Sequence, residues 1–274
     1  MAISTVGSIS LSNVLKDFRL TTKMKLIIAY TLAYSIWRYY SSDWMKNRWT
    51  TESIHFMSIQ STKEPTISLI YAHNACLAVD FGSSEEVVSE YLDGPVSHSH
   101  PRMLTLGTLL VEIARDDLRT PDQRQKIGSL RRCITQEHVR ALQVIREDLA
   151  WPHLGGNDQS NLTKDIYRDI TTKCLDRNFF RSFPFSSSTT EQGFNRSDDA
   201  LQDNHIDRRR YLIWRKVVAP LGALLNRLGW GQDWQSIEPM QARSYGRDST
   251  SSGYSPTIPT VTQPELLSAS DSNR

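Results

Sequence analysis

The tripeptide Asp80-Phe81-Gly82 is the part of this sequence whose residues could most directly carry out chemistry. An aspartate followed by Phe-Gly is the magnesium-binding signature of one class of phosphoryl-transfer enzymes. Three residues alone are a weak motif, because such a short match often arises by chance. The tripeptide therefore predicts phosphoryl transfer only if the other parts of such a site accompany it.

A second possible chemistry is metal binding by His98 and His100, with His73 and Asp80 earlier in the chain. Two histidines two residues apart share a face only on a strand. These two lie instead in a polar stretch (82–101) that ends in a proline, so we interpret them as solvated loop histidines and expect no metal site. The sequence also contains no G-x-S-x-G and no Cys/His pair with a local signature, so nucleophilic catalysis is not indicated.

Basic and aromatic residues alternate in DRRRYLIWRKVV (207–218), a combination that can bind single-stranded nucleic acid. Four apolar or aromatic residues of this segment also fit one stripe of a helix by their spacing: Tyr211, Trp214, Val217 and Val218. The cations would then form a solvated face on the other side: Arg208, Arg209, Arg210, Arg215 and Lys216. We favour this amphipathic core helix over a nucleic-acid site.

Trp44 and Trp49 follow the first long apolar segment and could form a platform for a flat ligand. Tryptophans in such positions also serve as anchors, because each ring buries a large apolar area. We favour the second interpretation, in which both rings fix the loop after the first long helix.

Composition predicts an ordinary globular protein of 274 residues, with 39% hydrophobic residues, 23% charged residues and a net charge of +2. A charge so close to balance does not call for nucleic acid or an acidic membrane as a partner. The three cysteines, Cys76, Cys133 and Cys174, form no Cys-x-x-Cys pair, which favours reduced thiols in an intracellular protein.

The opening residues show neither a basic start nor a long apolar run, so we expect no signal peptide. The most apolar stretch, MKLIIAYTLAYSIW (24–37), is shorter than the ~20 residues that a membrane span needs, and Lys25 interrupts it. These features predict an intracellular protein, located in the cytoplasm and without a membrane span.

Hydrophobic periodicity predicts a mainly α fold of about seven helices with a minor β element around 54–81. The expected helices cover 10–18, 20–40, 102–118, two amphipathic segments within 122–149 and 162–180, and 208–230, the last bent at Pro220. The segment 102–118 is apolar nearly all round, which is typical of a helix at the centre of a domain.

Composition and periodicity divide the chain into three parts. Residues 1–10 are expected to be a flexible N-terminus, and 11–235 a helical domain with a long loop at 184–207. Residues 236–274 are rich in Ser, Thr and Pro and lack periodicity, so they are expected to form a disordered tail.

Several segments resemble the C-lobe of protein kinases in their order along the chain. The segment 10–40 resembles the path from the hinge into helix E, and RMLTLGTLLVEIARDD (102–117) resembles the buried helix F. YRDITTKCLDRNF (167–179) is similar to a late C-lobe helix. From Leu11 to about Leu228 the chain is similar to a fungal family of unknown function with a degenerate kinase-like C-lobe. That family often stands beside helical heterokaryon-incompatibility or prion-inhibition domains.

The resemblance allows the catalytic positions of a kinase to be compared with this sequence. The catalytic loop H-R-D-x-x-x-x-N falls on 46–53, where Lys46, Asn47 and Arg48 replace His, Arg and Asp, and Ser53 replaces Asn. Arginine stays protonated and cannot accept the substrate proton. Arg102 holds the place of the aspartate that begins helix F and braces this loop.

The resemblance therefore implies an isolated kinase C-lobe without an N-lobe, because neither a Gly-rich loop nor its lysine precedes Leu11. Twenty-six residues separate Ser53 from Asp80, more than the tight hairpin of a kinase, so we judge the Asp-Phe-Gly tripeptide non-functional. We expect no catalytic residue, no cofactor, no metal and no ATP binding. The expected function is that of a pseudokinase-like interaction or regulatory module with a protein partner. The alternatives are a nucleic-acid-associated helical protein and an uncharacterised enzyme.

Overall fold

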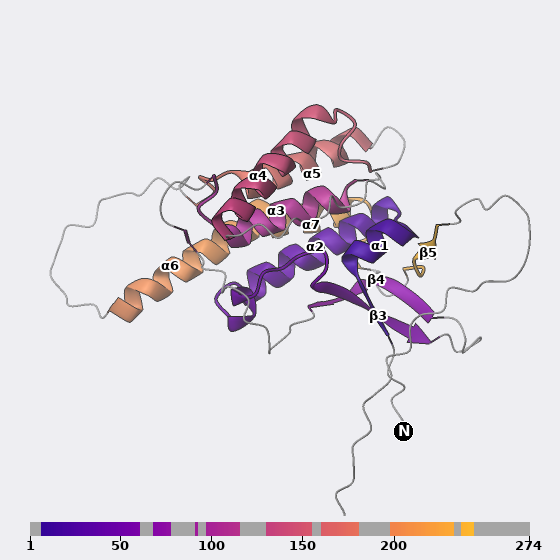
Figure 1. Cartoon of the computed structure of the whole chain (residues 1–274), viewed down its shortest axis with the longest axis horizontal. Coiled ribbons are helices and arrows are strands. Elements are labelled where there is room, and N and C mark those ends of the chain that lie inside the picture. Colours follow the sequence, from indigo (N-terminus) through magenta and orange to yellow (C-terminus); the bar gives the residue numbers. More distant parts are fainter. Residues whose placement is uncertain are drawn as a thin grey trace, which may run out of the picture. The chain divides into compact units, whose positions relative to one another are not determined.

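The computed structural model describes residues 7–60, 68–77, 91–92, 97–115, 130–154, 160–180, 198–232 and 237–243. Within these residues the chain is mainly α-helical, with a small antiparallel β element (Figure 1). The predicted fold class, mainly α with minor β, is therefore confirmed.

Two helices form the centre of the domain. Helix α2 (Thr22–Tyr39) is capped by Thr21, whose hydroxyl accepts a hydrogen bond from the Met24 N–H at 3.3 Å. Helix α3 (Pro101–Ile113) packs against α2 and is buried along most of its length, as predicted for 102–118. Leu109 in α3 is only 3% exposed. An apolar surface on all sides leaves α3 no stable position except the interior.

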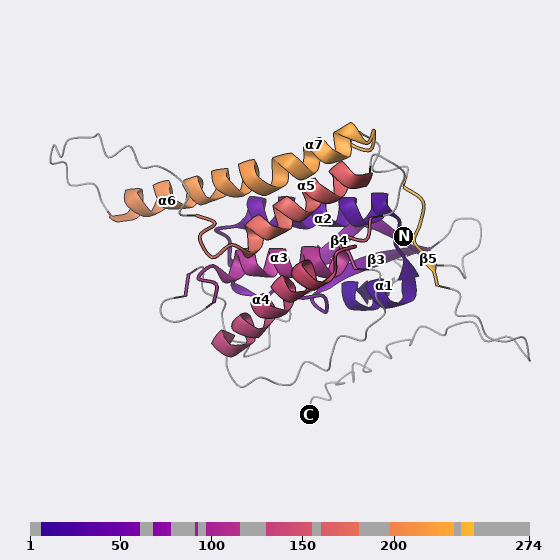
Figure 2. The same ribbon diagram turned by 90° about the horizontal axis from the view of Figure 1, so that it is seen from above.

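The other helices surround this pair. The short α1 (Leu11–Asp17) precedes α2, while α4 (Leu130–Glu147) and α5 (Ser160–Leu175) both pack against α3 (Figure 1). Seen from above, α6 (Asp198–Ile213), η2 (Trp214–Val218) and α7 (Ala219–Arg227) follow one another along α2 and α5 (Figure 2).

The last helical segment differs from the prediction at both its start and its bend. Residues 198–207 are helical, although the sequence predicted a loop over 184–207, because their polar sequence has no apolar stripe that periodicity could detect. Before Pro220, where the sequence predicted a bend, the helix forms a π-helical turn at 214–218. A wider turn accommodates the ring of Pro220, which would otherwise meet the carbonyl of Lys216.

The β element lies beside α2. Strands β3 (Ile54–Gln60) and β4 (Ser68–Leu77) form an antiparallel hairpin in which Ile54 stands opposite Leu77, with an irregularity between Phe56 and Ser58. Strand β1 (Ser8–Ser10) pairs with the other edge of β3. A second sheet joins β2 (Phe18–Arg19) to β5 (Gln241–Ala242).

Both predicted ends of the domain need correction. The expected flexible N-terminus already contains β1 at 8–10. The expected tail from residue 236 begins too early, because Ile237 and Met240 are buried and the Met240 N–H donates to the Ile70 carbonyl at 2.8 Å. These two apolar side chains and the short β5 hold the chain on the domain as far as Arg243. The predicted disorder of 244–274 lies outside the described residues.

Gly107 allows α3 and α5 to approach each other closely. A Cβ atom at this position would lie 2.7 Å from Cδ2 and 2.9 Å from Cγ of the buried Leu175. We expect Gly107→Ala to lower the free energy of unfolding by roughly 1–3 kcal/mol, because overpacking outweighs the gain in helix propensity. Urea denaturation measures this. Gly222→Ala in α7 is the matched control, since its Cβ would meet only the ring edge of the half-exposed Tyr30 at 3.2 Å. An equal effect in both variants would contradict the packing argument.

Candidate functional site

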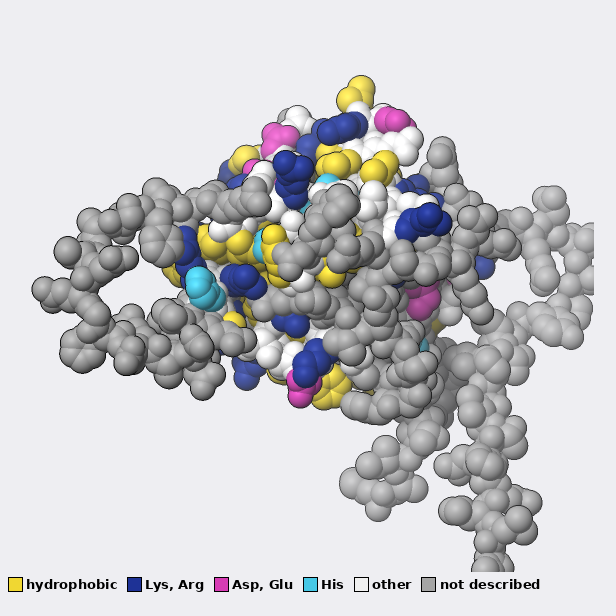
Figure 3. Space-filling view, turned by 60° about the vertical axis from the view of Figure 1, so that its left-hand side comes forward, with side chains coloured by type: hydrophobic (Ala, Val, Ile, Leu, Met, Phe, Trp, Pro, Cys, Tyr) yellow, Lys and Arg dark blue, Asp and Glu magenta, His cyan; other side chains and the backbone are white. Residues whose placement is uncertain are grey.

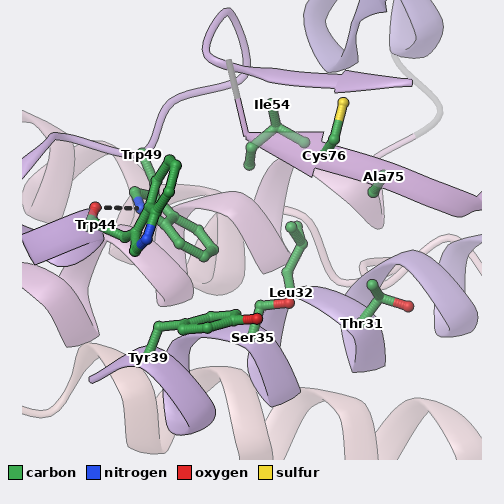
Figure 4. Close-up of a pocket in the computed structure, with 9 residues that line it drawn as sticks. All are labelled: Thr31, Leu32, Ser35, Tyr39, Trp44, Trp49, Ile54, Ala75 and Cys76. Carbon is green, nitrogen blue, oxygen red and sulfur yellow. Dashed lines mark hydrogen bonds between the residues drawn. The ribbon is translucent and has the colours of Figure 1, made fainter. Parts of the chain in front are cut away.

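A cleft of about 410 Å³ opens between α2, the 3-10 turn η1 (Asp43–Lys46) with the loop that follows it, and the β3–β4 hairpin (Figure 4). It is lined by nine residues: Thr31, Leu32, Ser35, Tyr39, Trp44, Trp49, Ile54, Ala75 and Cys76. Side chains from four separate segments therefore meet at one place.

Helix α2 forms one wall of the cleft. Thr31, Ser35 and Tyr39 are four residues apart, so their side chains lie on one face of the helix, with Leu32 beside them (Figure 4). Each of the three carries a hydroxyl group. The Thr31 Oγ1 atom is buried and has no hydrogen-bond partner among the described residues.

Two tryptophans form the opposite wall. Trp49 is 6% exposed, and its indole Nε1–H donates to the Trp44 carbonyl at 3.3 Å, so the prediction that Trp49 is an anchor is confirmed. Trp44 differs, because its side chain is 47% exposed and lines the cleft. The prediction that both rings act as buried anchors is therefore wrong for Trp44. Its position after α2 gave no indication that β3 and β4 would leave this ring uncovered.

The hairpin supplies the remaining side chains, Ile54 from β3 and Ala75 and Cys76 from β4. Partial burial raises the pKa of the Cys76 thiol, so this cysteine is a protonated, weak nucleophile at neutral pH. None of the described residues that line the cleft is charged. Its chemistry is consequently that of binding an apolar group, with hydroxyls available for hydrogen bonds.

The positions that the resemblance places in a catalytic loop do not converge on a common point. Lys46 forms an exposed ion pair with Asp43 at 2.6 Å, and Asn47 is exposed. The hydroxyl of Ser53 accepts a hydrogen bond from the Thr50 N–H at 2.8 Å. The same hydroxyl lies 3.2 Å from the Thr50 carbonyl, so its hydrogen bonds stabilise the turn from Thr50 to Ser53.

Arg48 turns toward α4, where its guanidinium forms an ion pair with Glu137. Burial alone would lower the pKa of Arg48. Glu137 and Cys133 raise the pKa by more than burial lowers it, so the net shift is upward. Arg48 is therefore a permanent cation that joins the loop before β3 to α4. Arg102, at the start of α3, is buried and donates to the carbonyl of Tyr40, the residue that ends α2.

The prediction that His98 and His100 are solvated is wrong, since they are 0% and 6% exposed. His98 Nε2 lies 3.2 Å from the Cys174 carbonyl, and the His138 Nε2 lies 2.8 Å from the Leu175 carbonyl. Both imidazoles thus satisfy carbonyls in the last turn of α5, which have no partner inside the helix. Among the described residues no group of three or more His, Cys, Asp or Glu could hold a metal ion. His73 is half-buried in β4, and Asp80 with the rest of the tripeptide 80–82 lies outside the described residues.

The basic segment 207–218 also differs from its predicted arrangement. Tyr211 and Trp214 are 49% and 38% exposed, and the buried stripe consists of Leu212, Ile213, Val217 and Val218. Three of the cations lie over aromatic rings: Arg209 over Phe180 at 5.6 Å, Arg210 over Trp37 at 5.5 Å, and Lys216 over Phe179 at 4.8 Å. Figure 3 shows the described Lys and Arg side chains of one face scattered among hydrophobic and acidic ones.

Most residues that line the cleft were not predicted from the sequence. A usable signal existed in α2, where the hydroxyl residues Thr31, Ser35 and Tyr39 recur every four positions within an otherwise apolar segment. The contributions of Ala75 and Cys76 had no such signal, because the pairing of β3 with β4 decides which residues of β4 face α2.

Comparison with known proteins gives one match. A family model described as a domain of unknown function (DUF7580) matches residues 4–228. The searches of curated proteins and of solved structures gave no match. No helix in the described part of the chain is long and apolar enough to cross a membrane.

Proposed function

This chain belongs to the DUF7580 family, a domain of unknown function, and from its own residues we propose that it is a non-catalytic interaction or regulatory module of the pseudokinase type. Following the resemblance of its sequence, we place this module in fungal self/non-self recognition or stress signalling, inside the cell. Its partner is a protein, and it uses neither ATP nor a metal.

One observation carries this proposal, namely the ion pair between Arg48 and Glu137. A kinase has a proton-accepting aspartate at the position of Arg48, whereas an arginine cannot accept a proton. The side chain here is also committed to α4, so it does not reach toward a phosphate or a hydroxyl substrate. Ser53, at the place of the magnesium-binding asparagine, is committed to its own turn in the same way.

The order of elements supports a relation to kinases. The hairpin of β3 and β4 ends at Leu77, three positions before Asp80. A kinase also has a hairpin between its catalytic loop and its Asp-Phe-Gly tripeptide. The long interval between Ser53 and Asp80 is occupied by this hairpin and its connection, so it does not argue against the relation.

The contact between α3 and α2 supports the same relation. In a kinase the first residue of helix F braces the catalytic loop, and here Arg102 in the first turn of α3 braces the end of α2 at Tyr40. The role of a brace is kept while the charge of the side chain is reversed. We infer a scaffold that retains the packing of a kinase C-lobe without its chemistry.

Surface aromatic residues support a protein partner rather than nucleic acid. The rings of Trp214 and Trp37 contact each other in a tilted arrangement, 4.8 Å between their centroids, where η2 packs on α2, and Tyr211 is exposed on the preceding turn. Exposed aromatic residues are enriched in protein interfaces. The neighbouring cation Arg210 lies over the Trp37 ring, so it is less available to phosphates than a solvated arginine.

The proposal predicts that ATP with magnesium leaves the melting temperature of the protein unchanged to within about 1 °C. A nucleotide at a hundred times its dissociation constant would add about 2.7 kcal/mol of stability, or roughly 5–10 °C. Differential scanning fluorimetry over a range of ATP concentrations measures this directly. Asp80→Ala is the informative variant. A saturable stabilisation that disappears in this variant would show that the tripeptide binds magnesium, and the proposal would be wrong.

A further inference from the structure

We propose that the cleft between α2, the Trp44–Trp49 loop and the β3–β4 hairpin is a binding site for an uncharged, largely apolar small molecule that contains a flat ring. Its volume of about 410 Å³ falls within the ~300–1,000 Å³ that is typical of small-molecule sites. This inference goes beyond the proposed function and does not depend on it.

The aromatic end of the cleft indicates a flat ligand. Tyr39, Trp44 and Trp49 stand together at this end (Figure 4). Aromatic rings bind other flat rings by offset or edge-to-face contact, which adds ~0.5–1.5 kcal/mol to the burial of the ring.

The exposed ring of Trp44 is held ready for such a contact. Its backbone carbonyl accepts the indole N–H of the buried Trp49, and this bond fixes the loop from which the Trp44 side chain projects. The ring itself remains 47% exposed, so folding leaves much of its apolar surface available to a ligand. A site that is already ordered costs less entropy when a ligand binds.

Hydroxyl groups along α2 give the site its polarity. Ser35 and Tyr39 line the cleft, and Thr31 Oγ1 has no hydrogen-bond partner among the described residues. The hydroxyl groups of Ser35 and Tyr39 can each form a hydrogen bond with a polar group of the ligand.

The lack of charge in the lining determines the class of ligand. The nine described lining residues include no Asp, Glu, Lys, Arg or His, and burial raises the pKa of the Cys76 thiol, which favours its neutral form. An anion or cation entering the cleft would lose hydration without meeting an opposite charge. Phosphorylated ligands are therefore excluded from this site, and uncharged ring compounds fit it.

The test titrates N-phenyl-1-naphthylamine into the full chain. This uncharged fluorophore carries a naphthalene and a phenyl ring, and its emission increases in apolar surroundings. We expect saturable binding at one site. Ser35→Trp, which fills the cleft, should abolish binding, and Trp44→Ala should weaken it roughly five- to tenfold. Trp214→Ala is the matched control, because this tryptophan is similarly exposed but packs on Trp37 outside the cleft, and its removal should change nothing.

Alkylation provides a second measurement that does not depend on fluorescence. Cys76 lines the cleft and is exposed, whereas Cys133 lies on α4. The fluorophore should slow the reaction of Cys76 with iodoacetamide, followed by mass spectrometry, and leave that of Cys133 unchanged. If Ser35→Trp does not fold, Trp44→Ala and the alkylation rates decide the question. Unsaturable binding, equal loss in Trp214→Ala, or an unprotected Cys76 would overturn the proposal.

Discussion

Replacing Trp151 by alanine is expected to lower the free energy of unfolding by about 3–5 kcal/mol, one of the largest effects of any single substitution in this domain. Trp151 is fully buried, and its ring meets that of Tyr167 at 6.0 Å. Its Nε1–H donates to the carbonyl of Val111 in α3 at 3.3 Å, and its own carbonyl accepts from Arg168 in α5. One side chain therefore joins α3, α5 and the segment after α4, and its removal leaves both a cavity and an unsatisfied carbonyl.

Thermal unfolding followed by circular dichroism measures this change, and the melting temperature should fall by on the order of 10 °C. Trp44→Ala is the matched control, because it deletes the same side chain at a position where it is half exposed. It should change stability by less than about 1 kcal/mol. Trp151→Phe, which keeps a ring and loses only the N–H donor, should fall between the two. Equal losses at Trp151 and Trp44 would show that Trp151 does not join the helices as described.

The sequence predicted the central helices well because the information that specifies them is local. Helix α2 has a cap at Thr21 and an apolar stripe with helical spacing, and α3 is apolar on every side. Each pattern limits the backbone to a helix before any tertiary contact is known. The minor β element was predicted for the same reason, since β-prone residues are concentrated in 54–81.

The errors concern contacts between distant parts of the chain. His98 and His100 lie in a short polar stretch, and nothing near them in sequence shows that α4 and α5 pack on His98 and that the Phe180 ring packs on His100. The stripe in 207–218 was assigned by helical spacing to the face with Tyr211 and Trp214, but Leu212 and Ile213 face the core in their place. The residues that α2 and α5 offer as partners decide which face of this helix is buried, and sequence periodicity alone could not choose between two adjacent faces.

The candidate site was harder to predict than the fold. The cleft exists because β4 pairs with β3 and thereby lies over α2, so its residues come from segments up to 45 positions apart, from Thr31 to Cys76. Of the cleft residues, only Trp44 and Trp49 were singled out from the sequence, as aromatic residues that follow the first long helix. Their residue type indicated a platform or an anchor, and the structure buries Trp49 while it leaves the Trp44 side chain half exposed.

The second large effect concerns acid. His98 is buried against His138 from α4, His100 in its own segment, and Cys174 and Asp176 at the end of α5. The Cys174 carbonyl can only accept, so Nε2 of His98 carries the proton, and Nδ1 accepts the N–H of His100 at 3.1 Å. The neutral imidazole therefore uses both of its nitrogens. A second proton on Nδ1 would face the N–H of His100 and break this arrangement.

Stability is expected to fall as the pH drops from about 6.5 to about 4. Burial first, and then the neighbouring His138 and His100, lower the pKa of His98 from 6.5 to about 4 in the folded state. Above pH 6.5 neither state binds the proton, and stability is complete. Between pH 6.5 and about 4 the unfolded chain binds a proton at His98 and the folded chain does not, so unfolding is favoured. At about 1.4 kcal/mol for each pKa unit, His98 alone accounts for roughly 3 kcal/mol.

Urea denaturation at several pH values between 7.5 and 4.5 measures this loss, and a variant isolates the contribution of His98. His98→Gln retains an N–H that can reach the Cys174 carbonyl but has no group that titrates in this range. We expect the variant to be less stable at pH 7.5 and to lose less stability on acidification than the natural chain. His205→Gln, at an exposed position in α6, should retain the full loss. The pKa of His138 is also lowered, chiefly by burial, so a smaller acid effect should remain in His98→Gln. His98 is the titrating group that the variant lacks. If His98→Gln instead lost as much stability on acidification as the natural chain, the acid sensitivity would therefore arise from other groups.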